Sequence, residues 1–372
     1  MTHARHLILG GGLFGLALAD HLVRRGAEQV VVLESGSSPS RRGLDETALV
    51  LRTGMASYRA LEDRALLLLE EWPSYLEVDP DYRRGGSLMG PVDAQEDSFG
   101  ERLTAREAAA RQPLLQLEPG EAARFFPDDG YLDTTQLLSA LHWQVRRRGV
   151  RIVFDCEVDA IQDRGSHYEF RAGHRRGQAS FVYFTGDPQH APLLPSCGIG
   201  PHTALVDWHR FLIETQSTGG CLIRLSLPPF PPLETASSTY DGGILELEYP
   251  EDEIPAEERQ VLLVDTHRRE RFLYMESGST SRVDTDSTTV DWAVLEAFRR
   301  SPRQPIRGLR EFVVRRGSAE LLPALDPVAP GILSNADRRA FAAGAFGRSI
   351  VLLALAVAER IAEETAAALP PT

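Results

Sequence analysis

The segment HLILGGGLFGLALADHLVRRGAEQVVVLE, residues 6–34, decides the fold. Its first apolar run ends at Gly10, where a cluster of glycines begins. Apolar residues then recur every three or four positions, which predicts a helix that stops at Gly26. A second apolar run, residues 30–33, ends in Glu34. Strand, glycine turn, helix, strand and terminal acid in this order are typical of a Rossmann-type dinucleotide-binding unit.

The glycine turn has a defined chemistry in such a unit. Gly10 permits the tight turn, Gly12 lets a pyrophosphate approach the backbone, and Gly15 lets helix and sheet pack closely. The first turn of the helix presents N–H groups and a positive dipole to phosphate. Glu34 is placed to accept hydrogen bonds from a ribose diol and would repel a 2′-phosphate, which favours FAD or NAD over NADP. The predicted cofactor contacts of this region are Gly10, Gly12, Leu13, Phe14, Gly15, Glu34, Ser35, Arg41 and Arg42.

The length and composition are those of a globular protein with two domains. The chain has 372 residues. This number exceeds the length that a single hydrophobic core usually accommodates. Its formal net charge of -13 argues against a nucleic-acid partner, because proteins that bind the phosphate backbone carry an excess of basic side chains. The sequence contains no lysine, so all of its Lys+Arg total of 40 is arginine. A mechanism through a lysine Schiff base is therefore excluded.

The remaining composition signals favour a cytoplasmic protein without metal. Cys156, Cys197 and Cys221 are odd in number and widely spaced, which favours a reducing compartment and no disulfide framework. Strand-like residues begin so close to Met1 that we expect no signal peptide. The apolar run 350–358 is shorter than the ~20 residues of a membrane span and predicts a buried helix. Neither metal-ligand spacing nor a nucleophile elbow is present, so the sequence supports neither a metalloenzyme nor a hydrolase.

The rest of the chain alternates between two predicted domains. Helices are predicted over 56–76, 104–111, 134–148 and 348–368, and strands over 150–154, 157–161, 181–184 and 341–343. Strands dominate the region 199–306, at 211–215, 221–227, 244–249, 261–265 and 272–275. The first predicted domain comprises residues 1–78, 116–198 and 307–372, and the second comprises residues 79–115 and 199–306.

In four segments the chain resembles the FAD-dependent superfamily of D-amino-acid oxidase, sarcosine oxidase and glycine oxidase. These segments are the fingerprint from Gly10 to Glu34, then Gly130-Tyr131-Leu132-Asp133, Phe184-Thr185-Gly186, and Gly344-Ala345-Phe346-Gly347 before the last helix. The resemblance implies an α/β fold, α+β overall. In it, a Rossmann-type FAD-binding domain is interleaved with a mainly antiparallel β-sheet substrate domain that covers the flavin ring.

The resemblance also implies further cofactor contacts. The backbone of Val158, in the strand after the helix that follows Asp133, corresponds to the adenine contact of the family. The start of the last helix corresponds to the pyrimidine edge of the flavin, where a positive helix end stabilises the negative charge of reduced flavin. The additional residues implied in this way are Val158, Gly186, Gly344, Phe346, Gly347, Arg348 and Ser349.

The chain departs from sarcosine oxidases at three places. Those enzymes attach the flavin through a cysteine that corresponds to residues 318–322, where this chain has none, so we expect non-covalent FAD. Their lysine on the last helix, which helps to hold the substrate carboxylate, corresponds to Val351, which implies a different carboxylate clamp or a substrate without a carboxylate. Their lysine near flavin N5, which promotes reaction with oxygen, has no counterpart in a chain without lysine.

The resemblance implies oxidation of a C–N bond in a small amine or amino acid, with hydride transfer to flavin N5. Oxidation of a 2-hydroxy acid on the same fold stays open, because a fold does not specify its substrate. A flavin-binding partner subunit without turnover is the alternative outside the enzymes. The oligomeric state and the electron acceptor are not specified by the sequence.

The candidate substrate residues are Arg52, Tyr274 and Arg316. Arg52 lies where related enzymes keep an arginine near the flavin, and its guanidinium can bind a carboxylate at two points, although a surface ion pair is an equal interpretation. Tyr274 ends a predicted strand of the pocket sheet and is a polar handle or a core residue. Arg316, or Arg315 beside it, is expected where the chain returns to the FAD domain. His209 is the one histidine considered as an acid–base group, against a structural role.

Overall fold

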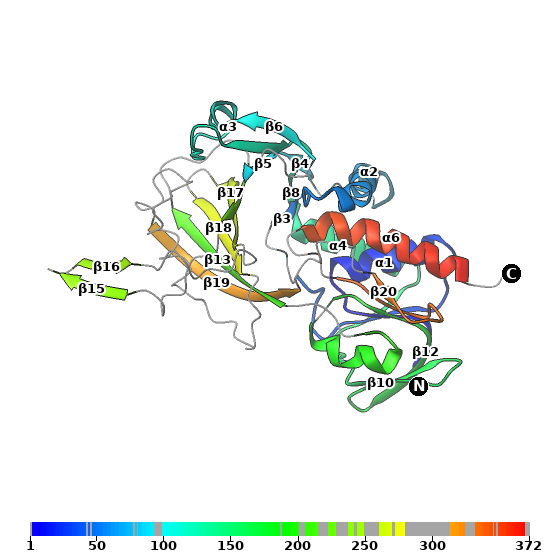
Figure 1. Ribbon diagram of the computed structural model, residues 1–372. Coiled ribbons are helices and arrows are strands. Elements are labelled where there is room, and N and C mark those ends of the chain that lie inside the picture. Colours follow the sequence, from blue (N-terminus) through cyan, green and yellow to red (C-terminus); the bar gives the residue numbers. More distant parts are fainter. Residues whose placement is uncertain are drawn as a thin grey trace. The chain divides into compact units, whose positions relative to one another are not determined.

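The computed structural model in Figure 1 describes most of the first domain and the strands of the second. The described residues are 2–41, 44, 47–76, 79, 81–92, 99–186, 188–200, 205–214, 222–227, 237–241, 244–248, 260–269, 272–279, 313–323, 332–344, 346 and 349–368. Between residues 205 and 323 the description is limited to backbone and strand pairing.

The chain divides into two compact units that alternate along the sequence. The first unit comprises residues 1–84, 129–204 and 323–372, and the second comprises residues 85–128 and 205–322. The sequence predicts changes of domain after residues 78, 115, 198 and 306, whereas the compact units change after residues 84, 128, 204 and 322. Strand β7 (Ala122–Phe126) pairs with β5 (Ser87–Val92) and β6 (Glu101–Thr104), and β19 (Val313–Pro323) is an edge strand of the same sheet. Strands β7 and β19 therefore belong to the second unit, because they pair within its sheet.

A parallel sheet forms the centre of the first unit. Strand β1 (Thr2–Leu9) pairs in parallel with β2 (Val30–Leu33) on one side and with β12 (Arg175–Phe184) on the other. Strand β9 (Arg151–Val153) extends the sheet beyond β2, and β21 (Ala340–Ala342) extends it beyond β12. The antiparallel strands β10 (Ala160–Asp163), β11 (Tyr168–Ala172) and β20 (Leu333–Ser334) are added to this framework. The expected strand over 157–161 thus begins three residues later, at Ala160.

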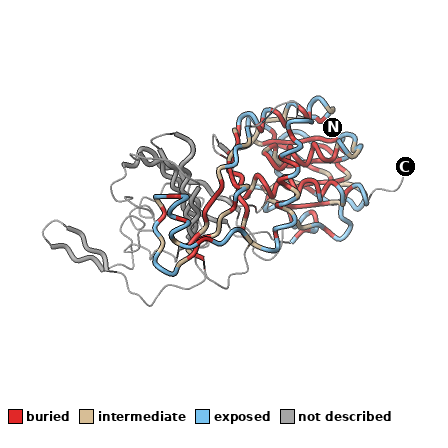
Figure 2. The backbone as a smooth tube through the Cα atoms, turned by 90° about the horizontal axis from the view of Figure 1, so that it is seen from above, coloured by how far each residue is buried: buried red, intermediate tan, exposed pale blue. Residues whose placement is uncertain are grey.

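Both faces of this sheet are buried, which explains the unbroken apolar runs of its strands. In β1, Ile8 packs into one core cluster, whereas Leu7 and Leu9 pack into the other. The core cluster of the second face contains side chains of β10, β11 and the segment 188–197. In Figure 2 the buried residues fill the interior of this unit and exposed residues follow its turns.

Four of the described helices bury side chains in the core cluster of the first face. They are α1 (Leu13–Arg24), α2 (Arg59–Leu76), α4 (Thr134–Arg147) and α6 (Ile350–Ala368). Figure 1 shows helices α1, α4 and α6 on the first face. Helix α1 packs against both α4 and α6, and α2 also packs against α6. A small sheet of β3 (Thr47–Val50), β8 (Gly130–Asp133) and β4 (Arg83–Arg84) adjoins them, and β3 contacts α6. The 3-10 turns η1 (Ala56–Tyr58) and η2 (Pro188–Cys197) complete the unit.

In the part of the second unit that the structure describes, a mixed sheet is accompanied by one helix, α3 (Ala105–Arg111). Its strand order is β19-β13-β18-β17-β14-β5-β7-β6. The strands not yet given are β13 (Leu205–Glu214), β14 (Leu222–Leu227), β17 (Gln260–Arg269) and β18 (Phe272–Ser279), with a separate hairpin of β15 (Ser237–Asp241) and β16 (Ile244–Glu248). Among the strand pairs whose register is described, only β14 and β5 are parallel and the others are antiparallel, which agrees with the predicted sheet. No helix among the described residues is long and apolar enough to cross a membrane.

Candidate cofactor site

The predicted cofactor residues meet at one edge of the parallel sheet. Gly10 follows the end of β1, Glu34 the end of β2, Gly186 lies just past the end of β12, and Gly344 just past the end of β21. Since these strands are parallel, their carboxyl ends share an edge. The chain leaves β1 toward β2 on one side and has β12 on the other, which makes β1 a topological switch point. Ligands of open α/β sheets bind at such points.

The turn after β1 requires glycine at two places. Gly10 has φ +108°, and its N–H donates to the carbonyl of Leu33 at 2.8 Å. A Cβ on Gly10 would collide with the Thr185 hydroxyl, and a Cβ on Gly15 would collide with the Gly10 carbonyl. Thr185 donates its hydroxyl to the Leu9 carbonyl at 2.7 Å, which ties the ends of β1 and β12 together. Sequence reasoning missed Thr185 as part of this turn.

The start of α1 fits a pyrophosphate. Its N-cap, Gly12, contributes no side-chain hydrogen bond, and the first turn contains no acid. Leu13 and Phe14 are buried, so they offer backbone rather than side chains. The positive end of the helix dipole is therefore not neutralised by this helix's own side chains, as an anion site requires.

Glu34 is fixed by backbone N–H groups on both of its carboxylate oxygens. Oε2 accepts from Gly11 at 2.6 Å and Oε1 accepts from Gly36 at 2.9 Å. Ser35 donates its hydroxyl to Oε1 at 3.4 Å, and Gln189 donates to Ser35 at 3.0 Å. Each carboxylate oxygen can accept more than one hydrogen bond, so this arrangement orients Glu34 and leaves capacity for a ribose diol.

The segment before Val158 runs beside Glu34. Cys156 donates its N–H to the Glu34 carbonyl at 2.9 Å, and Asp155 donates to the Gly36 carbonyl at 3.0 Å. Val158 is buried but lies in the connection between β9 and β10, not in a strand as expected. The contact with the Glu34 backbone is made by Cys156, two residues before Val158.

Gly186 and Gly344 are in close backbone contact. They have φ +82° and +143°, and a Cβ on Gly186 would lie 2.6 Å from the Gly344 Cα. Ala343 donates its N–H to the Phe184 carbonyl at 3.0 Å, next to this contact. Glycine at both positions allows the ends of β12 and β21 to approach.

The starts of α1 and α6 are joined by an aromatic pair. Phe346 is buried and meets Phe14 edge-on, with ring centroids 5.2 Å apart. Ser349 donates its N–H to the Phe346 carbonyl at 3.1 Å just before α6 begins. Val351, which corresponds to the family's lysine, is fully buried in α6. Gly347, Arg348 and Arg42 lie outside the described residues.

The two remaining predicted residues of this region differ in setting. Arg41 is exposed and donates to the Thr135 hydroxyl at 3.2 Å, near the start of α4. Arg52 is buried after β3, and its Nη2 lies 2.7 Å from Oδ1 of Asp63. The Arg52 N–H donates to Asp129 at 2.9 Å, so acidic residues that the sequence did not single out surround this arginine.

The other substrate candidates lie in the second unit. Tyr274 is in β18 opposite Leu212, and His209 is in β13 opposite Ser277. Arg315 and Arg316 lie within β19, so they belong to the second sheet and not, as expected, to the return into the first unit. Among the described residues no group of three or more His, Cys, Asp or Glu could hold a metal ion.

The chain is similar to known proteins over nearly its whole length. The DAO family model, described as FAD dependent oxidoreductase, matches residues 5–364. L-proline dehydrogenase from P. horikoshii is similar with TM-score 0.73 at 16% identity, covering 98% of this chain and 93% of that one. Glycine oxidase from Bacillus cereus ATCC 14579 gives 0.70 at 16% identity, covering 99% and 96%. L-amino acid deaminase from Proteus myxofaciens gives 0.67 at 14%, covering 100% and 91%. A search of curated proteins found no match.

Proposed function

Because the chain belongs to the DAO family of FAD-dependent oxidoreductases, we propose that it binds FAD non-covalently and oxidises a C–N bond of a small amine or amino acid. Bound FAD would supply the acceptor, flavin N5, for a hydride from the carbon that carries the nitrogen. The observation that carries the proposal is the shared strand edge at which Gly10, Glu34 and the Gly186–Gly344 contact lie.

Different residues of this edge would bind different parts of FAD. The start of α1 would hold the pyrophosphate, Glu34 the adenosine ribose, and the backbone near Val158 the adenine. The residues before α6 would hold the pyrimidine edge of the flavin, where the helix dipole stabilises negative charge. Non-covalent binding is supported by the described cysteines, Cys156 and Cys197, which are both buried. Burial raises the pKa of Cys197 to about 12, so its reactive thiolate is not formed near neutral pH.

An amino acid is the preferred substrate class. The three similar structures are named for proline, glycine and L-amino acids, each of which carries a carboxylate beside its nitrogen. Arg52 supplies a guanidinium for such a carboxylate, with Tyr274 and Arg316 as candidates in the second unit. The protein's task is to orient the substrate as the free amine, since a protonated amine is a poor hydride donor.

Anaerobic reduction of the purified holoprotein tests the proposal. We expect a yellow protein that releases its flavin on denaturation, and whose absorbance is bleached by an amine or amino acid but not by the matching 2-hydroxy acids. Bleaching by hydroxy acids alone would move the substrate to that class. A flavin that only dithionite reduces would identify a partner subunit without turnover, and a protein without flavin would overturn the proposal.

A further inference from the structure

Three carboxylates surround Arg52 and Thr53, which lie two and three residues beyond the end of β3. Asp129 accepts the N–H of Arg52 at 2.9 Å, and Glu62 accepts the N–H of Thr53 at 2.6 Å. Asp63 pairs with the guanidinium of Arg52 at 2.7 Å. Two of the acids therefore hold the backbone of this segment, while the third engages the side chain.

The two backbone-binding acids are fully buried. Glu62 and Asp129 each have 0% exposure. Burial of a carboxylate is costly unless it is hydrogen-bonded or paired, and burial raises the pKa of Glu62. Acids kept in such a setting fix the position of Arg52 and Thr53 tightly. They are positioning residues, because they act through Arg52.

Asp63 differs from Glu62 and Asp129 because its exposed side chain has room to turn away from Arg52. Its side chain is 51% exposed, whereas that of Arg52 is 11% exposed. Asp63 Oδ2 also lies 3.9 Å from Nε of Arg59, one turn earlier on α2. If Asp63 turned away from Arg52, it would keep a cationic neighbour in Arg59. An incoming carboxylate would then restore the charge balance of the less exposed Arg52.

The location of Arg52 suits this exchange. Strand β3, which ends two residues before Arg52, contacts α6. Figure 1 shows β3 beside the end of α6 that lies away from the chain's C-terminus, which is the end proposed to face the flavin.

We propose that Asp63 is an internal substitute for the substrate's carboxylate: it occupies Arg52 in the resting protein and gives it up to a carboxylate-bearing substrate. The inference rests on the proposed function only for the identity of the substrate, an α-amino acid rather than a simple amine. Binding of a carboxylate at Arg52 is a separate property and can be measured without turnover.

The test is a titration of the holoprotein with acetate, followed by the flavin absorbance. In Asp63→Asn the competing charge is removed, and we expect acetate to bind roughly two- to fivefold more tightly, the size of a partly exposed ion pair. Arg52→Gln should abolish the effect in both backgrounds. Glu70→Gln is the matched control, because Glu70 lies on the same helix, has the same 51% exposure and pairs with Arg84. It should leave acetate binding unchanged.

Turnover gives the second measurement. The ratio of KM for an amino acid to KM for its decarboxylated amine should fall in Asp63→Asn and rise in Arg52→Gln. Unchanged acetate affinity in Asp63→Asn, or intact acetate binding in Arg52→Gln, would overturn the exchange even if amines reduce the flavin. If no amine reduces the flavin, the proposed function fails, while the acetate titration still decides the exchange.

Discussion

Glu34 shows how one residue can organise the cofactor edge before a ligand binds. Its carboxylate accepts N–H groups from Gly11 and Gly36 and so joins the glycine turn to the loop after β2. We expect Glu34→Ala to raise the dissociation constant of FAD at least about tenfold, because a charged acceptor and the order of the turn are both lost. Flavin content after dialysis measures this. Glu28→Ala, at an exposed position, is the control, and equal flavin retention in both variants would contradict the assignment.

Substitution of Gly186 tests whether the ends of β12 and β21 approach each other closely. Gly186 and Gly26 have the same φ of +82°, but a Cβ on Gly26 meets nothing within 4 Å, whereas one on Gly186 meets Gly344. Gly26→Ala should therefore cost only the backbone strain, about 1 kcal/mol of unfolding free energy. Gly186→Ala should cost clearly more and lower flavin content. Urea unfolding of both variants measures the difference, and equal losses would refute the crowding.

His6 links burial to pH. Burial, with a smaller effect from Arg5, lowers the pKa of His6 to about 4 from 6.5. Between pH 6.5 and 4 the unfolded chain therefore binds a proton at His6 that the folded chain does not bind. The contribution of neutral, buried His6 to the free energy of unfolding is thus complete above pH 6.5. It is lost as the pH falls toward 4, at about 1.4 kcal/mol per pH unit.

His6→Phe removes this titration and keeps a ring to stack on Phe181. We expect thermal unfolding of the variant to depend less on pH between 6.5 and 4, whereas His174→Gln at an exposed position should behave as the parent. A slope identical to that of the parent protein in His6→Phe would show that His6 does not titrate in this way.

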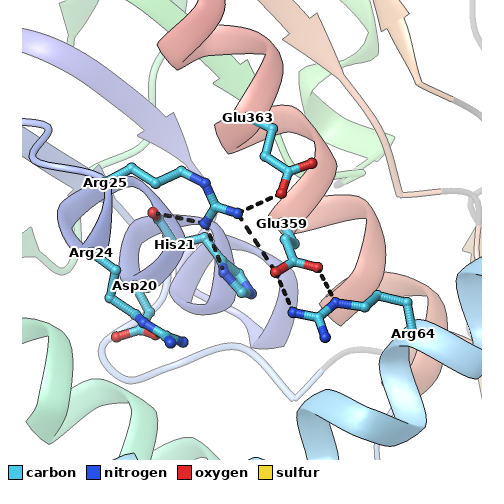
Figure 3. A network of polar contacts seen from close by, with 7 residues as sticks. All are labelled: Asp20, His21, Arg24, Arg25, Arg64, Glu359 and Glu363. Atoms are coloured by element: carbon cyan, nitrogen blue, oxygen red, sulfur yellow. Dashed lines mark hydrogen bonds and ion pairs between the residues drawn. The ribbon is translucent and has the colours of Figure 1, made fainter.

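At the scale of elements, three helices share one polar network (Figure 3). Glu359 of α6 accepts two hydrogen bonds from Arg64 of α2, at 2.6 and 2.8 Å, and lies 3.5 Å from Arg25 at the end of α1. His21 of α1 is buried beside it, and burial lowers its pKa to about 4. The network thus fixes the middle of α6, whose N-terminal end is proposed to face the flavin.

Glu359→Gln should lower the unfolding free energy by about 1–3 kcal/mol, because two arginines lose a common carboxylate in a mostly buried place. Glu363→Gln is the control one turn later: Glu363 is 59% exposed and pairs with Arg25. Its replacement should change stability little. Denaturant unfolding compares the two, and a Glu359→Gln loss no greater than that of Glu363→Gln would mean that the network does not hold the helices.

At the scale of the whole molecule, the absence of lysine bears on the electron acceptor. Related sarcosine oxidases use a lysine near flavin N5 to stabilise the negative charge that oxygen acquires. Arginine spreads its charge over a planar group and is a poorer substitute for a compact ammonium. We expect slower reoxidation by oxygen than in lysine-containing relatives. Stopped-flow mixing of reduced protein with air-saturated buffer tests this, and an equally fast reaction would refute it.

The sequence by itself determined several local elements of the first unit. The strand predicted over 30–33 is β2 with the same bounds, and the helices after Gly12 and Asp133 form where predicted. These features are readable because apolar periodicity, glycine turns and helix caps act between residues close in the chain.

Only the tertiary structure decided which distant segments meet. Strands β1 and β12 pair residues that lie 175 positions apart in the sequence, and the limits of the two units follow from such pairings rather than from local composition. The acids around Arg52 come from α2 and from the residue before β8, so no spacing in the sequence announces them. Strand pairing and buried charge contacts depend on non-local packing, and the tertiary fold alone places those groups within hydrogen-bonding distance.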